Sequence, residues 1–210
     1  MKKRKISTIL LDMYGVILEE SKGNFIPYTY QYFNETEHER LTKQFWQEKL
    51  FTKAGNGEIS SDMFLTLLGY ENPQYHMKNY LKNYVTLDND FLSFAQKYYA
   101  SVDFVLLSND VSEWSAFLTD YYKLDRYFKE KIISGNVKCR KPEKQIFKIT
   151  LERINRNPSE CIFVDNSVIN LNVANEIGIY PILFNRDKVE YAGITVNTFK
   201  ELTDIVETLM

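Results

Sequence analysis

The chain contains 210 residues, of which 44% are hydrophobic and 26% charged, and its formal net charge is −2. This balance excludes a generic nucleic-acid binder, which would carry an excess of basic residues. No run of about 18 apolar residues is present, so we expect no membrane span. The two cysteines, Cys139 and Cys161, are too few for a disulfide framework and lack metal-ligand spacing, which favours a reducing, cytoplasmic setting. The length fits one domain, alone or with a sizeable insertion, and we expect a monomer or a homodimer.

The first apolar run, residues 7–11, ends in Asp12 and is followed by a turn at Gly15. This pattern predicts a strand that carries a carboxylate at its carboxyl end. Open α/β folds place their ligand sites at that edge of the sheet. We therefore expect Asp12 to belong to a functional site.

Residues 20–87 contain no convincing strand. Apolar residues at helical spacing predict helices over residues 37–51, 60–68 and 73–85. We interpret the segment as a small all-helical cap inserted after the first strand, on the side where that strand delivers its carboxylate. The remaining residues, 1–19 and 88–210, would form the core.

From residue 88 onward, predicted helices and strands alternate. Helices are expected at residues 91–98, 112–121 and 200–209, and in a stretch that Pro142 opens and that runs to Leu151. A further helix is expected through Leu171, Ala174 and Ile177, ended by Gly178. Strands are expected at residues 102–107, 132–133, 161–164 and 179–184. Continuous apolar strands alternating with helices indicate a parallel sheet covered on both faces. The predicted fold class is α/β, with a doubly wound, Rossmann-like core.

Polar residues follow three of the predicted strands. Asp12 follows the first, Ser108 and Asn109 follow the second, and Asp165 and Asn166 follow the strand at 161–164; Lys141 lies between the last two. A carboxylate can attack phosphorus and form an aspartyl-phosphate, which divides a difficult hydrolysis into two easier steps. Two anions meet only when a cation such as Mg²⁺ and a fixed lysine neutralise charge. This set could hold a cation and a phosphate together.

Four short motifs carry a resemblance to the haloacid dehalogenase-like hydrolase superfamily over essentially the whole chain. They are Leu11-Asp12-Met13-Tyr14-Gly15-Val16, Leu106-Leu107-Ser108-Asn109, Arg140-Lys141-Pro142-Glu143 with Ile146-Phe147, and Phe163-Val164-Asp165-Asn166-Ser167 with Asn170. They occur in the family's order, each at a predicted strand end or helix start. With Gly57-Glu58-Ile59-Ser60, the sequence most resembles the glucose-1-phosphatase-type phosphatases and the epoxide-hydrolase N-terminal domain.

The resemblance implies a role for each matched residue. Asp12 would be the nucleophile, Ser108 with Asn109 would bind phosphate oxygens, and Lys141 would stabilise Asp12 and the transferring group. Asp12, the backbone carbonyl of Tyr14, Asp165 and Asn166 would hold Mg²⁺. The implied activity is Mg²⁺-dependent hydrolysis of a small phosphorylated, sugar-phosphate-like metabolite through an aspartyl-phosphate on Asp12.

Two positions depart from the family pattern. Tyr14 stands where most family phosphatases carry the aspartate that protonates the leaving group, and a phenol with an ordinary pKa near 10 is a poor acid. The 2-haloacid dehalogenases carry tyrosine there, so a metal-independent dehalogenase is the first alternative, although Gln47 stands where we would expect their halide-binding arginine and Asp165 is retained. Asn166 replaces a second metal-binding aspartate. A weakly active or non-catalytic ligand-binding member is the second alternative.

Several further side chains have two interpretations. In the predicted cap, five side chains could face a substrate: Asn24, Phe25, Tyr28, Trp46 and Phe51. The four aromatic ones could instead simply pack. Asp110 could cap the helix that follows it or contact a polar substrate. We interpret His38 and His76, the only histidines, as surface residues.

Overall fold

The computed structural model describes residues 6–21 and 23–210, so residues 1–5 of the expected core and Lys22 of the expected cap lie outside the described residues. Six strands form one sheet in the order β3-β2-β1-β4-β5-β6, and every neighbouring pair is parallel. The strands are β1 (Thr8–Leu11), β2 (Asp103–Ser108), β3 (Phe128–Ile133), β4 (Cys161–Asp165), β5 (Tyr180–Phe184) and β6 (Ile194–Val196). The predicted doubly wound α/β class is confirmed.

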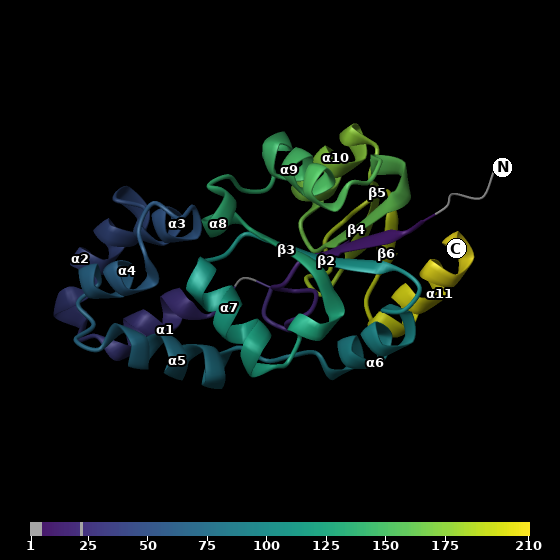
Figure 1. Ribbon diagram of the computed structural model, residues 1–210. Helices are drawn as coiled ribbons and strands as arrows, with labels where there is room; N and C mark the ends of the chain where they lie inside the picture. The colour runs from purple at the N-terminus through teal and green to yellow at the C-terminus, as the bar shows by residue number, and fades with distance from the viewer. Residues whose placement is uncertain (1–5, 22) are drawn as a thin grey trace.

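Alternate residues of the central strands face opposite sides of the sheet. Leu10 belongs to one apolar cluster, and its neighbours Ile9 and Leu11 belong to the other. The Leu10 cluster packs against α9 (Lys144–Ile154) and α10 (Val168–Ile177). The other packs against α6 (Asn89–Tyr98), α7 (Ser112–Tyr121) and α11 (Phe199–Leu209). Because helices bury both faces (Figure 1), the strands read as continuous apolar runs.

The core helices begin and end close to the predicted positions, with one correction. Asp88 caps α6 through Asp90 N–H, and Gly178 ends α10 in the left-handed conformation, with φ of 99°. Pro142 was expected to open a helix, but α9 begins only at Lys144. The backbone at Lys141 is hydrogen-bonded on both sides by Asn109, which holds this stretch at the sheet edge outside any helix.

Residues 23–87, here named the helical segment, lie at the end of the sheet toward which the strands point (Figure 1). It contains α1 (Phe25–Tyr32), α2 (His38–Thr42), a π-helical turn (Lys43–Gln47), α3 (Leu50–Gly55), α4 (Ser61–Leu67) and α5 (Pro73–Tyr84). The helices predicted at 60–68 and 73–85 are confirmed. The helix predicted over 37–51 is confirmed for residues 38–47 but does not run on unbroken: the chain turns at Lys49, whose φ is 55°. α1 was not predicted.

The high aromatic content packs the interior of this segment. The Phe25 ring lies within 5.5 Å of the rings of Phe51, Phe64, Tyr80 and Trp114, centroid to centroid. His76 was predicted to lie at the surface, but it is buried between aromatic rings and only 8% exposed. Aromatic contacts between short helices therefore give this segment its core.

Within the described residues, no helix is long and apolar enough to cross a membrane.

Shorter helical turns complete the chain. α8 (Ser134–Val137) follows β3, and 3₁₀ turns occur at Glu35–Glu37, Asp125–Tyr127 and Pro158–Glu160. The helical segment is joined to the core by two linkers that run side by side. Glu19 N–H bonds the Thr86 carbonyl and Asp88 N–H bonds the Ile17 carbonyl, each at 3.0 Å. Both linkers thus leave and re-enter the core at one place.

Candidate active site

Three polar strand ends meet because β1 lies between β2 and β4. Asp12 follows β1, Ser108 ends β2 and Asp165 ends β4, and the parallel register brings the three ends together at one edge. After β1 the chain builds β2 and β3 on one side and later β4 on the other. This reversal of strand order is where open α/β sheets form their ligand crevices.

Lys141 joins the two carboxylates. Its Nζ lies 2.7 Å from Asp12 Oδ1 and 2.8 Å from Asp165 Oδ2. All three residues are buried, with exposed fractions of 3%, 8% and 0% for Lys141, Asp12 and Asp165. When both buried carboxylates are ionised, one ammonium leaves one negative charge uncompensated, and that is costly away from water.

The electrostatics of the site follow from this burial. Burial raises the pKa of Asp12 above its ordinary value, and Lys141 opposes that change while Asp165 adds to it. Burial alone would lower the pKa of Lys141, yet the two carboxylates outweigh it and raise that pKa. Additional positive charge beside Asp12 would favour its ionised form.

Hydrogen bonds fix the backbone of Lys141 and the side chain of its partner Asp165. Asn109 accepts from Lys141 N–H and donates to the Lys141 carbonyl, both at 2.8 Å. Asp165 accepts from Ser167 N–H at 2.7 Å and from Asn170 Nδ2 at 3.1 and 3.2 Å. Asn109 was predicted to contact substrate. Its side chain is bonded to the backbone of Lys141, and it also lines the cavity above Asp12.

Oxygen atoms suited to Mg²⁺ are present at this edge. Asp12 and Asp165 supply carboxylates, and Asn166 packs against the turn after β1, where its Nδ2 lies 3.5 Å from the Ser21 carbonyl. At Gly15, with φ of 77°, a Cβ would lie 2.3 Å from Asn166 Nδ2, so only glycine fits. Among the described residues, no cluster of three or more His, Cys, Asp or Glu side chains could bind a metal. Any cation site here would need the amide or carbonyl oxygens that Asn166 and Tyr14 offer.

Ser108 ends β2 almost fully buried, at 1% exposed. Its Oγ has no hydrogen-bond partner among the residues that the structure describes. A buried hydroxyl without a partner carries a desolvation cost that a ligand oxygen would relieve. This observation fits the predicted phosphate contact.

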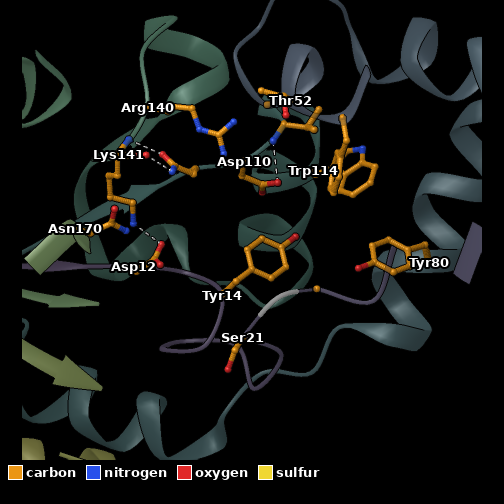
Figure 2. Close-up of a pocket in the computed structure, with 15 residues that line it drawn as sticks. Asp12, Tyr14, Ser21, Thr52, Tyr80, Asp110, Trp114, Arg140, Lys141 and Asn170 are labelled. Carbon is orange, nitrogen blue, oxygen red and sulfur yellow. Dashed lines mark hydrogen bonds and ion pairs between the residues drawn. The ribbon is translucent and has the colours of Figure 1, made fainter. Parts of the chain in front are cut away.

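A cavity of about 250 Å³ opens above Asp12, between the strand ends and the helical segment (Figure 2). The lining residues from the core are Asp12, Tyr14, Asn109, Asp110, Val111, Trp114, Arg140, Lys141 and Asn170. The others are Ser21, just before the helical segment, and Gly23, Phe51, Thr52, Gly55 and Tyr80 of that segment. Of the five aromatic or polar side chains considered for substrate contact, only Phe51 lines the cavity. Phe25 and Tyr28 are buried, and Trp46 is 62% exposed.

Asp110 anchors the start of α7 and also lines the cavity. Its Oδ1 accepts from Val111 N–H at 2.8 Å and its Oδ2 from Ser115 Oγ at 2.5 Å, so it anchors the start of α7. It also lines the cavity, although it is only 6% exposed. Burial raises the pKa of Asp110 to about 7, because its hydrogen bonds to Ser115 and Val111 only partly offset the loss of water.

Comparison with known families and structures gives consistent results. The profile of haloacid dehalogenase-like hydrolases matches residues 6–178. No curated protein matches the sequence. The crystal structure of a HAD phosphatase from Thermococcus onnurineus is 18% identical, covers 96% of this chain and 98% of its own, and superposes with a TM-score of 0.76.

Two further solved structures show the same fold. HAD family enzyme bt-2542 from Bacteroides thetaiotaomicron, in complex with magnesium and inorganic phosphate, is 21% identical over 89% of this chain and 98% of its own, with a TM-score of 0.73. A dehalogenase is 18% identical over 95% and 96%, with a TM-score of 0.68. The fold is therefore common to enzymes of both chemistries.

Proposed function

The chain belongs to the haloacid dehalogenase-like hydrolases, and from that premise we propose that it is a Mg²⁺-dependent phosphohydrolase of a small phosphorylated metabolite. The observation that carries the proposal is Lys141 held between Asp12 and Asp165 at adjoining strand ends. The uncompensated negative charge calls for a further cation, which a phosphate ester requires and an uncharged carbon–halogen bond does not. A relative of the same fold was crystallised with magnesium and phosphate.

The chain's own groups suit the first chemical step. Asp12 Oδ1 is occupied by Lys141 and by Met13 N–H at 2.8 Å, whereas Oδ2 has no hydrogen bond among the described residues. We therefore assign Oδ2 as the atom that attacks phosphorus. The bond between phosphorus and the leaving oxygen then breaks, and its electron pair stays with that oxygen. Water hydrolyses the aspartyl-phosphate in the second step.

Lys141 and Ser108 would hold the phosphoryl group during both steps. Asp12, Asp165, Asn166 and the Tyr14 carbonyl would hold Mg²⁺. Bound there, the cation would offset the charge of the carboxylates and of the phosphoryl oxygens. The Lys141 ammonium, already oriented by two carboxylates, costs no reorganisation when the phosphoryl group arrives.

We extend the proposal to the parts around the site. Residues 20–87 would act as a cap that closes over the core of residues 1–19 and 88–210, because Phe51, Thr52, Gly55 and Tyr80 form one wall of the cavity. A volume of about 250 Å³ suits a small, sugar-phosphate-like molecule. Two free cysteines fit a cytoplasmic protein, which we expect to be a monomer or a homodimer.

Tyr14 supports a second candidate function, a metal-independent 2-haloacid dehalogenase. Its ring lines the cavity near Asp110 (Figure 2). Burial, with Asp110 and Tyr80 nearby, raises the pKa of Tyr14 well above the ordinary value of 10.0. Such a phenol donates a hydrogen bond but no proton, and a departing halide needs none. A weakly active, ligand-binding protein is the remaining alternative.

One experiment separates the three. Phosphate release from a panel of phosphorylated metabolites is measured with Mg²⁺ and with EDTA, and halide release from 2-chloropropionate is measured in EDTA. Phosphate release that requires Mg²⁺ is the expected result. Halide release in EDTA would establish the dehalogenase instead. Binding of phosphate or a phosphate ester without turnover would mark the ligand-binding alternative.

A further inference from the structure

Arg140 is a second cation in the cavity, and it differs from its neighbour Lys141. The lysine is committed to Asp12 and Asp165. The guanidinium of Arg140 lines the same cavity, half-buried, and has no ion pair or hydrogen bond with any residue in the described part of the chain. A cation partly removed from water without a partner is costly unless a ligand supplies the counter-charge.

The backbone that carries Arg140 is fixed. The two hydrogen bonds from Asn109 hold Lys141, and the Arg140 carbonyl accepts from Glu143 N–H at 2.8 Å. Figure 2 shows the two side chains going separate ways: Lys141 points to Asp12, and Arg140 extends toward the side where Thr52 and Asp110 lie. Arg140 is thus placed away from the attacking carboxylate.

Asp110 is the acidic side chain toward that side of the cavity, and it does not neutralise Arg140. Both of its oxygens are already bonded within α7 and the loop before it, to Val111 N–H and Ser115 Oγ. Among the described residues, Arg140 and Asp110 form no ion pair, and the partners of the two Asp110 oxygens are Val111 and Ser115. The guanidinium therefore stays available to a ligand.

We propose that Arg140 binds a second anionic group of the substrate, a carboxylate or a second phosphoryl group, while the first phosphoryl group lies at Asp12. The planar guanidinium suits both, because it donates two parallel hydrogen bonds to either oxyanion. Thr52 of α3, on the opposite wall, offers a hydroxyl to the same group. The substrate class is thus a phosphate monoester that carries a second negative charge. The inference rests on the proposed function for the position of the first phosphoryl group.

Non-hydrolysable probes test this without turnover. Calorimetry in excess Mg²⁺ compares methylphosphonate, which has one anionic group, with 3-phosphonopropionate and propane-1,3-diphosphonate, which have two. We expect the wild type to bind at least one two-anion probe about ten- to hundredfold more tightly, as hydrogen bonds to charged groups allow. The better of the two identifies a carboxylate or a phosphoryl partner.

Arg140→Gln should remove that preference and leave the methylphosphonate Kd within about twofold of the wild type, whereas Arg140→Lys should retain part of it. The matched control is Lys138→Gln, which removes one positive charge from an exposed side chain two positions away and should change neither Kd. Three results would overturn the proposal: equal affinity of the wild type for all probes, no measurable binding, or equal weakening of methylphosphonate by Arg140→Gln. A preserved preference in a protein that releases no phosphate would refute the proposed function alone.

Discussion

The two halves of the cavity are built on different principles. In the core half, Asp12 and Asn109 follow strand ends, Lys141 lies just before α9 and Asn170 lies in α10. Each is hydrogen-bonded to another polar group of the site. In the helical half, Phe51, Thr52, Gly55 and Tyr80 are supplied by α3, by its end and by α5. Aromatic rings and a hydroxyl make up this wall, and no charged side chain from the described residues of the helical segment lines the cavity.

This difference separates chemistry from selectivity. A charged network held by the sheet can activate one type of bond, whatever the rest of the substrate looks like. By the proposed function, the helical half and Arg140 would contact whatever group the phosphoryl is attached to. Changes in the core half should therefore abolish turnover, and changes at the interface with the helical segment should alter stability or substrate preference.

The largest expected loss of turnover comes from changing Asp12 in the core half. Asp12→Asn preserves the shape and the hydrogen bond from Met13 but removes the attacking oxyanion, so we expect turnover to fall by at least about 10³-fold. Phosphate release and the melting temperature are measured together, to show that the fold persists. A variant that keeps more than a few per cent of the wild-type rate would exclude Asp12 as nucleophile.

Asp165 tests whether the core half binds a cation. At a Mg²⁺ concentration 100 times the Kd, the wild type should gain about 2.7 kcal/mol of stability, because the ion binds only the folded state. Asp165→Asn keeps the size of the side chain but replaces one acceptor oxygen by a donor amide, and it should remove most of this gain. The measurement is the melting temperature with Mg²⁺ and with EDTA. No Mg²⁺ effect on the wild type would favour dehalogenation.

Tyr14 lies where the two halves meet. If a missing general acid limits the phosphatase, an aryl phosphate with a good leaving group should react much faster than a sugar phosphate. Tyr14→Asp should then accelerate the sugar phosphate selectively, by up to roughly 10²-fold. The measurement is the ratio of kcat/KM for the two substrates in both proteins, with Tyr14→Phe as the control. An unchanged ratio in folded protein would show that Tyr14 has another role.

The sequence predicted the core half better than the helical half, and the reason is physical. A buried parallel strand and the polar residue at its end are local features, so β1, β2 and β4 and the positions of Asp12 and Asp165 followed from short apolar runs. β6 was missed because three residues are too few to show a pattern. Pro142 misplaced a helix start because Asn109, distant in sequence, holds the backbone beside it.

The helical half depends on how short helices pack. α1 was missed because Pro27 interrupts its pattern, although a proline in the first turn is tolerated. The break at Lys49 places a non-glycine residue at positive φ, which no composition signal marks. Tyr80 lies on a helix that was predicted. The contacts of Tyr80 with Trp114 and Phe25 determine which face of that helix lines the cavity. Arg140 was visible only as part of a motif.

Asp110 makes the stability of the core half depend on pH. It is a buried acid, and its hydrogen bonds to Val111 and Ser115 anchor the start of α7. Its pKa is about 7 in the folded protein against an ordinary 3.8. Between these values the folded state binds a proton that the unfolded state does not, so this carboxyl lowers stability as the pH rises from about 4 to about 7. Asp110→Asn should remove that loss.

The expected gain for Asp110→Asn, relative to wild type, is on the order of 2 kcal/mol at pH 8 compared with pH 5. Urea unfolding at the two pH values measures it. Asp12 titrates in the same direction and helps to raise the pKa of Asp110, so the difference reports Asp110 together with its interaction with Asp12. Curves that shift in parallel with pH would show that the folded state holds Asp110 ionised throughout.

The smallest expected effect concerns the contact that joins the two halves. Trp114 Nε1 of the core donates to Ser61 Oγ of α4 at 2.8 Å, and both residues are 1% exposed. Ser61→Ala leaves this indole N–H without its partner and should cost about 1 kcal/mol in urea unfolding. In a double-mutant cycle with Trp114→Phe, the coupling energy should be of the same size. Ser60→Ala is the matched control, because Ser60 caps the same helix through Met63 N–H and should not couple to Trp114. A coupling near zero for Ser61 would mean that α4 is not docked on the core through this bond. The helical half would then be held by aromatic packing and by its other bonds to the core, from Ser61 N–H to Glu113 Oε1 and from Ser134 Oγ to the Gly55 carbonyl.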